Sequence, residues 1–529
     1  MIRRLPNTVI GSRLPVLLGD VPLFNTHYSR RIQRVFSSSS TTTGNTARNA
    51  WKVAIVGSGP SGCYTAKYLA ASKDYSFATI DILERLPTAY GLVRNGVAPD
   101  HPEVKNVQND FDAVINDQAS NKIRFFGNVQ VGRDVSLEEL RKLYDMVVLA
   151  YGCESDRVLS LPGASLQGIL SARQFVAWYN GHVDFDWVGP IVQQALKGDI
   201  VILGHGNVAL DCARILAKSR DELDPTDLTT RALDILHPAM SSSSSQDETK
   251  RTISVVGRRG HVQGAFTIKE LRELTKLPHA DFVVRLDELE KGKSTLASQQ
   301  ELKDSRPRTR MDTLLMEAAK TGAKGASRQV HLRFLLNPIR FEASDEDPSS
   351  VGRVVCERTQ LQGEAGSQRA VGTGEEESIN AQLALVSIGY KGVAIEGTEP
   401  WFDQSLGILK NNHGLVDPPT DELGGLYTAG WLKRGPSGII GTNIADAKDT
   451  VTSMLHDMAS RSPKVSSDSS AHELKELLQE RGVDYVDWDG YQRIEVAESS
   501  SQHKRHPDQP REKITSRQEL LDVARSIPK

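Results

Sequence analysis

The chain repeats one pattern of apolar and polar positions: a short apolar run, a glycine-rich turn, and then a helix-forming stretch. The first apolar run, Val53–Val56, contains no charged residue, which is typical of a strand buried on both faces of a parallel sheet. The runs Ile200–Leu203 and Gly425–Ala429 precede similar turns. Strands that alternate with helices in this way predict an α/β fold built on parallel sheets.

The first turn has the spacing G-x-G-x-x-G, with Gly57, Gly59 and Gly62 at its fixed positions. The first glycine makes the tight turn, the second lets the backbone approach a pyrophosphate, and the third lets the helix pack on the strand. The N-terminus of the following helix offers free N–H groups to the anion. Glu84 ends the next apolar run and is placed to bind ribose hydroxyls. The pattern predicts a dinucleotide site, and the alternative is a glycine-rich turn without a ligand.

A second turn of this kind follows Ile200–Leu203. Gly204, Gly206 and Ala209 occupy the three positions of G-x-G-x-x-(G/A), and a helix-forming stretch follows. Two dinucleotide motifs in one chain are a much stronger signal than one. They imply two nucleotides that exchange electrons.

Two arginines, Arg258 and Arg259, follow the strand predicted over 252–257. In a doubly wound sheet, ligands lie at the carboxyl ends of the strands. An NAD-binding unit usually has an acid here for the ribose 2′-hydroxyl, whereas two guanidinium groups favour a 2′-phosphate. The pair therefore predicts NADP(H) as the second nucleotide; the alternative is a surface pair without a ligand.

A third helix N-terminus is expected after the run Gly425–Ala429 and a loop that contains Gly435 and Gly438. The positive end of such a helix can face a flavin carbonyl. A strand that returns this late implies that the first domain is discontinuous and that the second domain is inserted in it.

Charge is distributed unevenly along the 529 residues. Residues 1–50 contain seven Arg, no Lys and one acid, which makes this segment +6 and the remainder −9. An Arg-rich, Ser/Thr-rich and acid-poor N-terminus is typical of a mitochondrial transit peptide, and the alternative is a disordered basic tail. The net charge of −3 gives no argument for nucleic acid, and no apolar run approaches the roughly 18 residues that span a bilayer.

The four cysteines, at 63, 153, 212 and 356, form no C-x-x-C pair. The sequence therefore encodes neither a local metal site nor a dithiol redox pair. The cysteines are expected to be small buried residues in a reducing compartment.

Isolated polar residues leave more than one interpretation open. His101 lies in a Gly/Pro-rich loop and is either a functional imidazole or a turn histidine. Glu270 lies in an amphipathic helix and is either a ligand or a solvated acid. Arg306, Arg308 and Arg310 form a basic patch that either docks an acidic partner or is a soluble face.

Two polar segments give little structural signal. Ser241–Ser245 is a low-complexity insertion and is expected to form a solvated loop. Residues 464–529 are polar and low in aromatics, and they are expected to wrap the surface or to be partly disordered.

Several motifs together resemble the mitochondrial adrenodoxin reductase family, which are NADPH-dependent ferredoxin reductases of the glutathione-reductase-like flavoprotein class. The resemblance spans nearly all of residues 51–460. The stretches that carry it are 52–62, 98–106, 198–213, 258–260, 266–273, 431–438 and 510–513. The sequence departs from the family pattern at Cys63, where an aromatic residue is usual, at His205, where Gln is common, and at His261, where Pro is usual.

The resemblance implies two cofactors, FAD and NADP(H). The implied FAD contacts are Ser61, Glu84, Leu92, Val131, Trp431, Gly438, Ile439 and Ile440. The implied NADP(H) contacts are Gly204, His205, Gly206, Asn207, Arg258, Arg259, Glu270 and Gly438. His101 and Asp211 match family residues near the flavin and the nicotinamide and are the implied catalytic positions, while Arg306 and Arg310 match basic residues that meet an acidic [2Fe–2S] ferredoxin.

The expected fold is two doubly wound Rossmann-like domains, with an NADP-binding domain inserted in a discontinuous FAD-binding domain. The expected segments are a transit peptide, the first part of the FAD domain, the NADP domain, and the second part of the FAD domain with a C-terminal extension, at 1–45, 46–155, 156–385 and 386–529.

The leading functional hypothesis is a flavoprotein that passes electrons from NADPH through FAD, one at a time, to a mitochondrial ferredoxin. An NADPH-dependent flavin monooxygenase shares both nucleotide motifs and is the nearest alternative. A nucleotide-binding scaffold without turnover is the alternative from another class. The expected location is the mitochondrial matrix, with peripheral association with the inner membrane left open.

Overall fold

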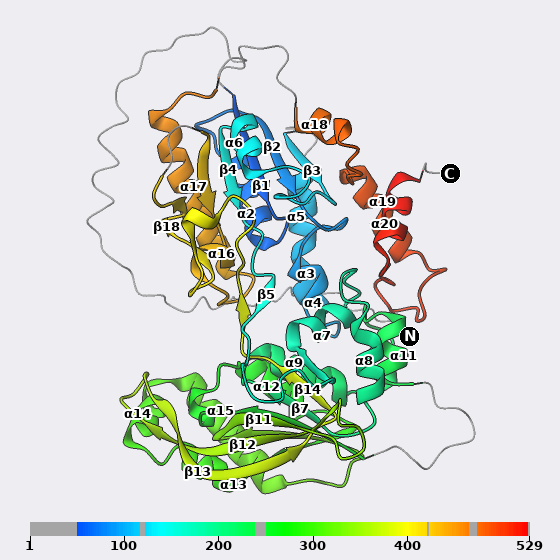
Figure 1. Cartoon of the computed structure of the whole chain (residues 1–529), viewed down its shortest axis with the longest axis vertical. Helices are drawn as coiled ribbons and strands as arrows, with labels where there is room; N and C mark the ends of the chain where they lie inside the picture. The colour runs from blue at the N-terminus through cyan, green and yellow to red at the C-terminus, as the bar shows by residue number, and fades with distance from the viewer. Residues whose placement is uncertain (1–49, 117–121, 239–249, 420–422, 465–472, 527–529) are drawn as a thin grey trace, which may run out of the picture. The chain divides into compact units, whose positions relative to one another are not determined.

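Two largely parallel β-sheets form the framework of the structure (Figure 1). The computed structural model describes residues 50–116, 122–238, 250–419, 423–464 and 473–526. The first sheet has the order β18-β19-β20-β4-β1-β2-β3. Its strands are β1 (Trp51–Val56), β2 (Phe77–Leu83), β3 (Ile123–Phe126), β4 (Met146–Leu149), β18 (Asn411–Asn412), β19 (Leu415–Val416) and β20 (Gly425–Thr428). The five strands from β20 to β3 run parallel, and β18 and β19 extend the β20 edge in antiparallel register.

The second sheet is parallel throughout and has the order β6-β14-β7-β8-β10-β9. Its strands are β6 (Ile169–Ser171), β7 (Ile200–Leu203), β8 (Arg251–Gly257), β9 (Ala280–Val284), β10 (Arg328–Phe334) and β14 (Leu383–Val386). An antiparallel sheet joins it, formed by β11 (Leu336–Ala343), β12 (Val351–Gln362) and β13 (Arg369–Asn380). A short ladder pairs β16 (Phe402–Asp403) with β17 (Ile408–Leu409).

The connections between parallel strands are mostly helical, as a doubly wound fold requires. Those of the first sheet are α2 (Pro60–Ala70), α3 (Leu92–Asn95), α4 (Pro102–Lys105), α5 (Val107–Ile115) and α6 (Leu137–Leu143), and two more helices, α16 (Trp431–Arg434) and α17 (Thr442–Ser460), follow its last strand. Those of the second are α7 (Ala172–Tyr179), α8 (Val188–Ala195), α9 (Asn207–Ala217), α10 (Arg220–Leu223), α11 (Thr230–Leu236), η1 (His261–Gln263), α12 (Ile268–Leu274), α13 (Leu286–Gly292), α14 (Leu296–Asp304) and α15 (Arg306–Thr321). No helix among the described residues is both long enough and apolar enough to cross a bilayer.

Both motif-bearing strands are buried on their two faces. In β1, Val53 and Ile55 belong to one apolar core, whereas Ala54 and Val56 belong to another. Successive side chains of a strand point to opposite faces of the sheet, so each face of β1 is covered by its own layer. The residues of β7 divide between two cores in the same way. The prediction of strands without a solvent face is confirmed.

The chain passes between the two sheets twice, at β5 (Ser155–Asp156) and at β15 (Tyr390–Lys391). These two segments pair with each other in antiparallel register. The strands of the second sheet all lie between them in sequence, and β20 then returns to the first sheet beside β4. This topology, together with the comparisons below, confirms the expected fold class. The domain bounds stay a prediction, and the transit peptide and Ser241–Ser245 lie outside the described residues.

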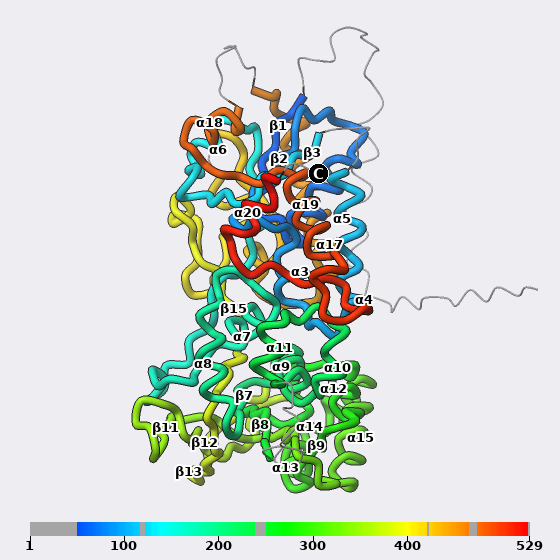
Figure 2. The backbone as a smooth tube through the Cα atoms, turned by 90° about the vertical axis from the view of Figure 1, so that its right-hand side faces the viewer, coloured from blue at the N-terminus to red at the C-terminus, as the bar shows by residue number. Residues whose placement is uncertain are grey.

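The C-terminal segment is more ordered than its composition indicates. It forms α18 (Leu474–Glu480), α19 (Trp488–Ser499) and α20 (Arg517–Arg525). Tyr491, Ile494 and Leu520 are buried in the same core as the side chains of β1. Figure 2 shows α19 beside β3, where the rings of Phe125 and Trp488 meet edge to face at 5.9 Å. Of the two alternatives for this segment, packing on the surface of the first sheet fits residues 473–526, because a few well-spaced apolar residues anchor them.

Lys513, in the C-terminal segment, and Lys105 both pair with the carboxylate of Asp227. Lys105 Nζ lies 2.6 and 2.7 Å from the two oxygens of Asp227, and Lys513 Nζ lies 3.1 Å from Asp227 Oδ2. Lys513 also donates to Arg94 O at 3.2 Å and to Asn180 Oδ1 at 3.1 Å. Burial lowers the pKa of Lys513 to about 7; Asp227 opposes this, and repulsion from Lys105 and Arg94 adds to it.

We expect Lys513 to make stability depend on pH. Its pKa is 10.5 when exposed and about 7 in the fold, so between these values the unfolded chain binds more protons. The free energy of unfolding contributed by this residue therefore rises with pH across that window. In urea unfolding from pH 6 to pH 10, wild-type stability should increase relative to Lys513→Met.

Lys475→Met provides the matched control, because Lys475 lies on the same C-terminal segment and is exposed. Its difference from wild type should not vary with pH. If the difference in the free energy of unfolding between Lys513→Met and wild type is also independent of pH, Lys513 is not the source of the pH dependence.

Candidate dinucleotide sites

The first glycine turn leaves one open face beside the sheet. Gly57 has φ of 109°, and a Cβ there would lie 2.6 Å from Ala150 O. A Cβ on Gly62 would lie 1.9 Å from Gly57 O, because α2 packs directly on the turn. In contrast, no atom lies within 4 Å of a Cβ built on Gly59. The turn is tight at its first and third positions and open at the second, where a pyrophosphate would approach.

The second turn repeats this arrangement. Gly204 has φ of 138°, and a Cβ there would lie 2.1 Å from Ser387 O. No atom lies within 4 Å of a Cβ built on Gly206, and Ala209 is fully buried. Ala150 follows β4 and Ser387 follows β14. Each turn therefore lies where the strand order of its sheet reverses, between β1 and β4 in the first sheet and between β7 and β14 in the second. This is where doubly wound sheets bind ligands, and both cradles fit the phosphates of a dinucleotide.

Glu84 and Leu92 lie next to the first cradle. Glu84 Oε2 accepts from Ser58 N at 3.1 Å and from Ser58 Oγ at 2.7 Å, and Glu84 Oε1 accepts from Leu86 N at 3.0 Å. Burial raises the pKa of Glu84, although these hydrogen bonds oppose the change. Leu92 follows Gly91, whose Cβ would lie 3.4 Å from Gly59 Cα.

Val131 occupies a different environment from the other predicted flavin contacts. Its side chain is buried in an apolar core with Val129 and Val135. Val129 N donates to Glu84 O at 2.9 Å, so the segment lies beside Glu84. A ligand at the cradle would meet Val131 chiefly through its backbone.

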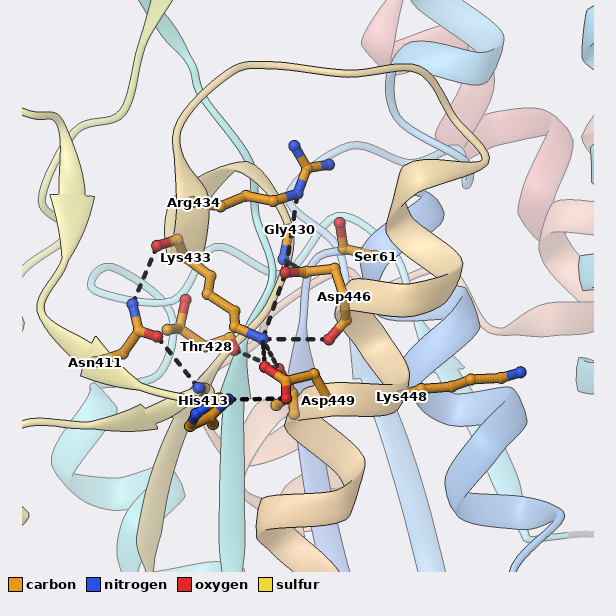
Figure 3. Close-up of polar contacts among 12 residues, drawn as sticks. Ser61, Asn411, His413, Thr428, Gly430, Lys433, Arg434, Asp446, Lys448 and Asp449 are labelled. Carbon is orange, nitrogen blue, oxygen red and sulfur yellow. Dashed lines mark hydrogen bonds and ion pairs between the residues drawn. The ribbon is translucent and has the colours of Figure 1, made fainter. Parts of the chain in front are cut away.

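The loop between β20 and α17 rests on the start of α2 (Figure 3). Gly430 has φ of 76°, and a Cβ there would lie 1.8 Å from Ser61 Oγ. Ser61 Oγ in turn donates to Asn443 Oδ1 at 3.1 Å. Trp431 Nε1 donates to Ser437 O at 3.2 Å, which closes the loop on itself. The structure therefore brings Ser61 and Trp431 together from opposite ends of the chain.

The tip of this loop is exposed. Gly438 and Ile439 are solvent-accessible, with Ile439 69% exposed, and Ile440 is half-buried. An isoleucine this exposed at a glycine-rich turn is consistent with a face that a ligand covers.

Arg258 and Arg259 present free guanidinium groups at the end of β8. Their backbone is fixed, because Leu335 N donates to Arg259 O at 3.2 Å and Thr359 Oγ1 donates to Arg258 O at 2.7 Å. Both side chains are exposed, and neither forms a hydrogen bond or ion pair with another described residue. A fixed backbone with two unpaired cations suits an anionic group beside the second cradle.

Thr267 links Asn207 and Glu270 at the starts of α9 and α12. Thr267 N donates to Asn207 Oδ1 at 2.8 Å, and the Thr267 hydroxyl donates to the Glu270 carboxylate. Glu270 is thereby held near the second cradle rather than paired with Lys269 or Arg272.

His205 points away from the open side of its turn. Its ring packs edge-on against Phe334 at 4.8 Å and Phe266 at 6.0 Å. A Cβ on Gly257 would lie 2.2 Å from His205 Nδ1. Burial lowers the pKa of His205 to about 4. A ligand would therefore meet this residue through its backbone, and the neutral ring adds no charge.

His101 and Asp211 belong to an ion-pair network between α4 and α9. His101 Nε2 lies 3.0 Å from Glu273 Oε2, and Arg214 Nη1 lies 2.7 Å from Asp211 Oδ1 and 3.3 Å from Glu273 Oε2. Arg214 also holds Asp100 through two bonds, at 2.6 and 2.9 Å. Burial raises the pKa of Asp211, and the charge of Arg214 opposes the change.

The basic patch contains two available charges rather than three. Arg308 pairs with Glu301 at 2.8 Å. Arg306 and Arg310 are exposed on the first turns of α15 and pair with no other described residue. They lie four residues apart, so they share one face of the helix.

Sequence reasoning missed Asp100, Arg214, Glu273 and Tyr390. Asp100 adjoins His101, and Arg214 lies three residues after Asp211 on the same helix face, so both left a weak local signal. Tyr390, on β15, packs against Trp431 at 5.2 Å between ring centroids and left none.

Comparison with known proteins identifies the class of protein first. Residues 51–261 match the family model described as pyridine nucleotide-disulphide oxidoreductase. Together with the two equivalent cradles, this match defines an oxidoreductase built to hold two dinucleotides. All four cysteines lie among the described residues, where they are buried and form no disulfide.

Closer relatives define the family. The chain is 41% identical to the mitochondrial NADPH:adrenodoxin oxidoreductase of Arabidopsis thaliana, over 93% of this chain and 98% of that protein. It is 39% identical to the protein of that name from Homo sapiens, over 96% of each. A solved structure of Mycobacterium tuberculosis FprA in complex with NADPH is 36% identical, with a TM-score of 0.79 over 90% of this chain and 99% of that one.

The chain belongs to the family of NADPH:adrenodoxin oxidoreductases. The resemblance found in the sequence is confirmed, and so, at the level of the family, is the expectation of FAD and NADP(H) as the two cofactors.

Alanine substitutions at the two glycines of the second turn should separate effects on NADPH affinity from effects on the free energy of unfolding. Gly206 has an ordinary φ of −105° and open space in front of it, so Gly206→Ala should change the free energy of unfolding by less than about 1 kcal/mol. The added methyl group would occupy the approach to the phosphates, so the dissociation constant for NADPH should rise at least about tenfold.

Gly204→Ala is the matched comparison. Its positive φ and its contact with Ser387 O should destabilise the fold by about 1–3 kcal/mol. Thermal unfolding and NADPH titration of both variants test the assignment. Wild-type NADPH affinity in Gly206→Ala would show that the open face is not the phosphate site.

Proposed function

We propose that the chain is an NADPH-dependent ferredoxin reductase, with FAD at the Gly57–Gly62 cradle and NADP(H) at the Gly204–Ala209 cradle. The observation that carries this proposal is the pair of equivalent cradles, of which the second is followed by the free guanidinium groups of Arg258 and Arg259. The family of the chain supports the same activity.

The proposal assigns the remaining contacts by cradle. The FAD contacts, besides Gly57, Gly59 and Gly62, are Ser61, Glu84, Leu92, Val131, Trp431, Gly438, Ile439 and Ile440. The NADP(H) contacts are Gly204, His205, Gly206, Asn207, Arg258, Arg259, Glu270 and Gly438. FAD held by the first set of residues would supply the chemistry that takes a hydride from NADPH and passes single electrons to a [2Fe–2S] centre.

His101 and Asp211 are the proposed catalytic positions. Both belong to the network that joins α4 to α9, and Tyr390 extends from the same region to Trp431. The raised pKa of Asp211 lets its carboxyl hold a proton more readily than an exposed aspartate does. The reaction needs no protein nucleophile, so these residues orient the rings and adjust the local charge.

The proposed partner is an acidic mitochondrial [2Fe–2S] ferredoxin, docked on Arg306 and Arg310. The support is the exposure of these two side chains and the absence of a described acid that pairs with them. A mitochondrial location, in the matrix or on the matrix face of the inner membrane, is supported by the relatives that carry that word in their names and by the Arg-rich segment 1–45.

An anaerobic absorbance experiment tests the function. The purified protein should carry a bound flavin, and one equivalent of NADPH should bleach the flavin band. An acidic [2Fe–2S] ferredoxin with cytochrome c should then restore the band. Arg306→Glu with Arg310→Glu should leave the bleaching unchanged and slow the recovery about tenfold at low salt, because docking depends on charge.

The two alternatives give different results. A flavin monooxygenase would oxidise NADPH rapidly in air without ferredoxin and would form a hydroxylated product. A scaffold without turnover would be colourless, or its flavin would resist NADPH. Either result would overturn the proposal.

Cofactor preference tests the arginine pair. Arg258→Ala with Arg259→Ala removes both cations that favour a 2′-phosphate, so the Michaelis constant for NADPH should rise at least about tenfold and that for NADH should change little. Steady-state kinetics with both nucleotides measure this difference. Equal effects on NADPH and NADH would exclude the pair from 2′-phosphate recognition.

A further inference from the structure

A buried lysine lies beneath the loop that carries the proposed flavin contacts. Lys433 is on the short helix α16, and its side chain is 8% exposed. Its Nζ donates to Asp449 Oδ2 at 2.8 Å and to Thr450 Oγ1 at 3.1 Å, and lies 3.4 Å from Asp446 Oδ1 (Figure 3). The loop surface above is exposed, whereas this ammonium group is enclosed by α17.

Asp446 joins this lysine to the first peptide of the loop. Its Oδ2 accepts a hydrogen bond from Gly430 N, and its Oδ1 faces Lys433 Nζ. The Asp446 side chain is also 8% exposed. Gly430 rests directly on Ser61, where a Cβ would lie 1.8 Å from the hydroxyl oxygen. One carboxylate therefore connects the ammonium group with the peptide that contacts α2.

Two neighbouring basic side chains, Arg434 and His413, make their hydrogen bonds to groups other than the Asp446 carboxylate. Arg434 donates to Ser437 O, to Thr442 Oγ1 at 3.1 Å and to Asn443 Oδ1 at 3.0 Å, and its Nε lies 3.8 Å from Asp446 Oδ1. His413 lies 3.0 Å from Asp449 at the exposed side. Lys433 is thus the cation closest to Asp446.

We propose that Lys433 and Asp446 form a positioning pair that fixes Gly430 and Trp431 against α2 and so sets the geometry of the flavin-facing loop. This inference rests on the proposed function, because it assigns a role toward FAD. A buried ion pair adds little net stability compared with apolar residues of similar size. Its effect is instead directional: the carboxylate holds the Gly430 peptide in one orientation, and the lysine holds the carboxylate.

Substitution of either member should weaken FAD binding. In Lys433→Met, Asp446 is left buried beside a peptide without its closest cation, so the Gly430 turn should shift. The dissociation constant for FAD, measured by fluorescence titration of the flavin-depleted full chain, should rise at least about tenfold. The visible circular dichroism of the bound flavin should change as well, since it reports the surroundings of the ring.

Asp446→Asn is a milder second variant, because its amide oxygen can still accept from Gly430 N. It should raise the FAD dissociation constant by a smaller factor than Lys433→Met does. The double variant Lys433→Met/Asp446→Asn removes both charges and keeps this acceptor. It should therefore bind FAD more tightly than Lys433→Met alone, which a general loss of stability would not produce.

Two controls separate positioning from stability. Lys448→Met changes a lysine of α17 that points away from the cluster, with its Nζ 5.0 Å from the Tyr68 ring (Figure 3). Arg333→Met breaks a buried ion pair with Glu288, at 2.8 Å, attached to the second sheet. The first should leave FAD affinity and thermal midpoint near wild type, and the second should lower the midpoint without changing FAD affinity.

An FAD affinity within twofold of wild type in both Lys433→Met and Asp446→Asn would overturn this inference and leave the proposed function intact. So would a double variant that binds FAD no better than Lys433→Met. A wild-type protein that neither carries nor accepts FAD would instead overturn the proposed function.

Discussion

The structure depends on two places where the backbone approaches a neighbouring strand so closely that only glycine fits. At Gly57 and Gly204 a Cβ would lie 2.6 and 2.1 Å from a carbonyl oxygen, and φ is positive at both. Each glycine lets the chain turn from a central strand into a helix. The N-terminus of that helix, α2 after Gly57 and α9 after Gly204, then lies where the strand order of the sheet reverses. The exposed cradles follow from this close packing.

A network of charged side chains joins helix α9 to the segment before α4 and to α12. Arg214 is 1% exposed, yet its guanidinium reaches Asp100, Asp211 and Glu273. Burying this many ionisable groups is tolerable only because each has a partner of opposite sign. Such an interface constrains the orientation of the groups it contains.

The features that could be predicted from the sequence are local ones. The strand, turn and helix around Gly57 lie within about twenty residues, and Arg258 and Arg259 directly follow a predicted strand. What could not be predicted depends on residues far apart in sequence. The break between β10 and β11 is one example: it falls at Leu335, with φ of 58°, because β10 joins a parallel sheet and β11 an antiparallel one. The aromatic contact of Trp488 with Phe125 has no local signature either.

Charge becomes informative once the structure shows which groups are already paired. From sequence alone, Arg306, Arg308 and Arg310 are equivalent, but Glu301 neutralises Arg308 and leaves the other two exposed. Lys433, which the sequence places beside the predicted flavin contact Trp431, is instead buried against acids of α17. The residues after 50 carry a net charge of −9, so acidic side chains are in excess there. Arg306 and Arg310 nevertheless pair with none of the described acids, whereas Arg308 and Lys433 do. That contrast, more than the presence of arginine, favours a ligand or partner at these positions.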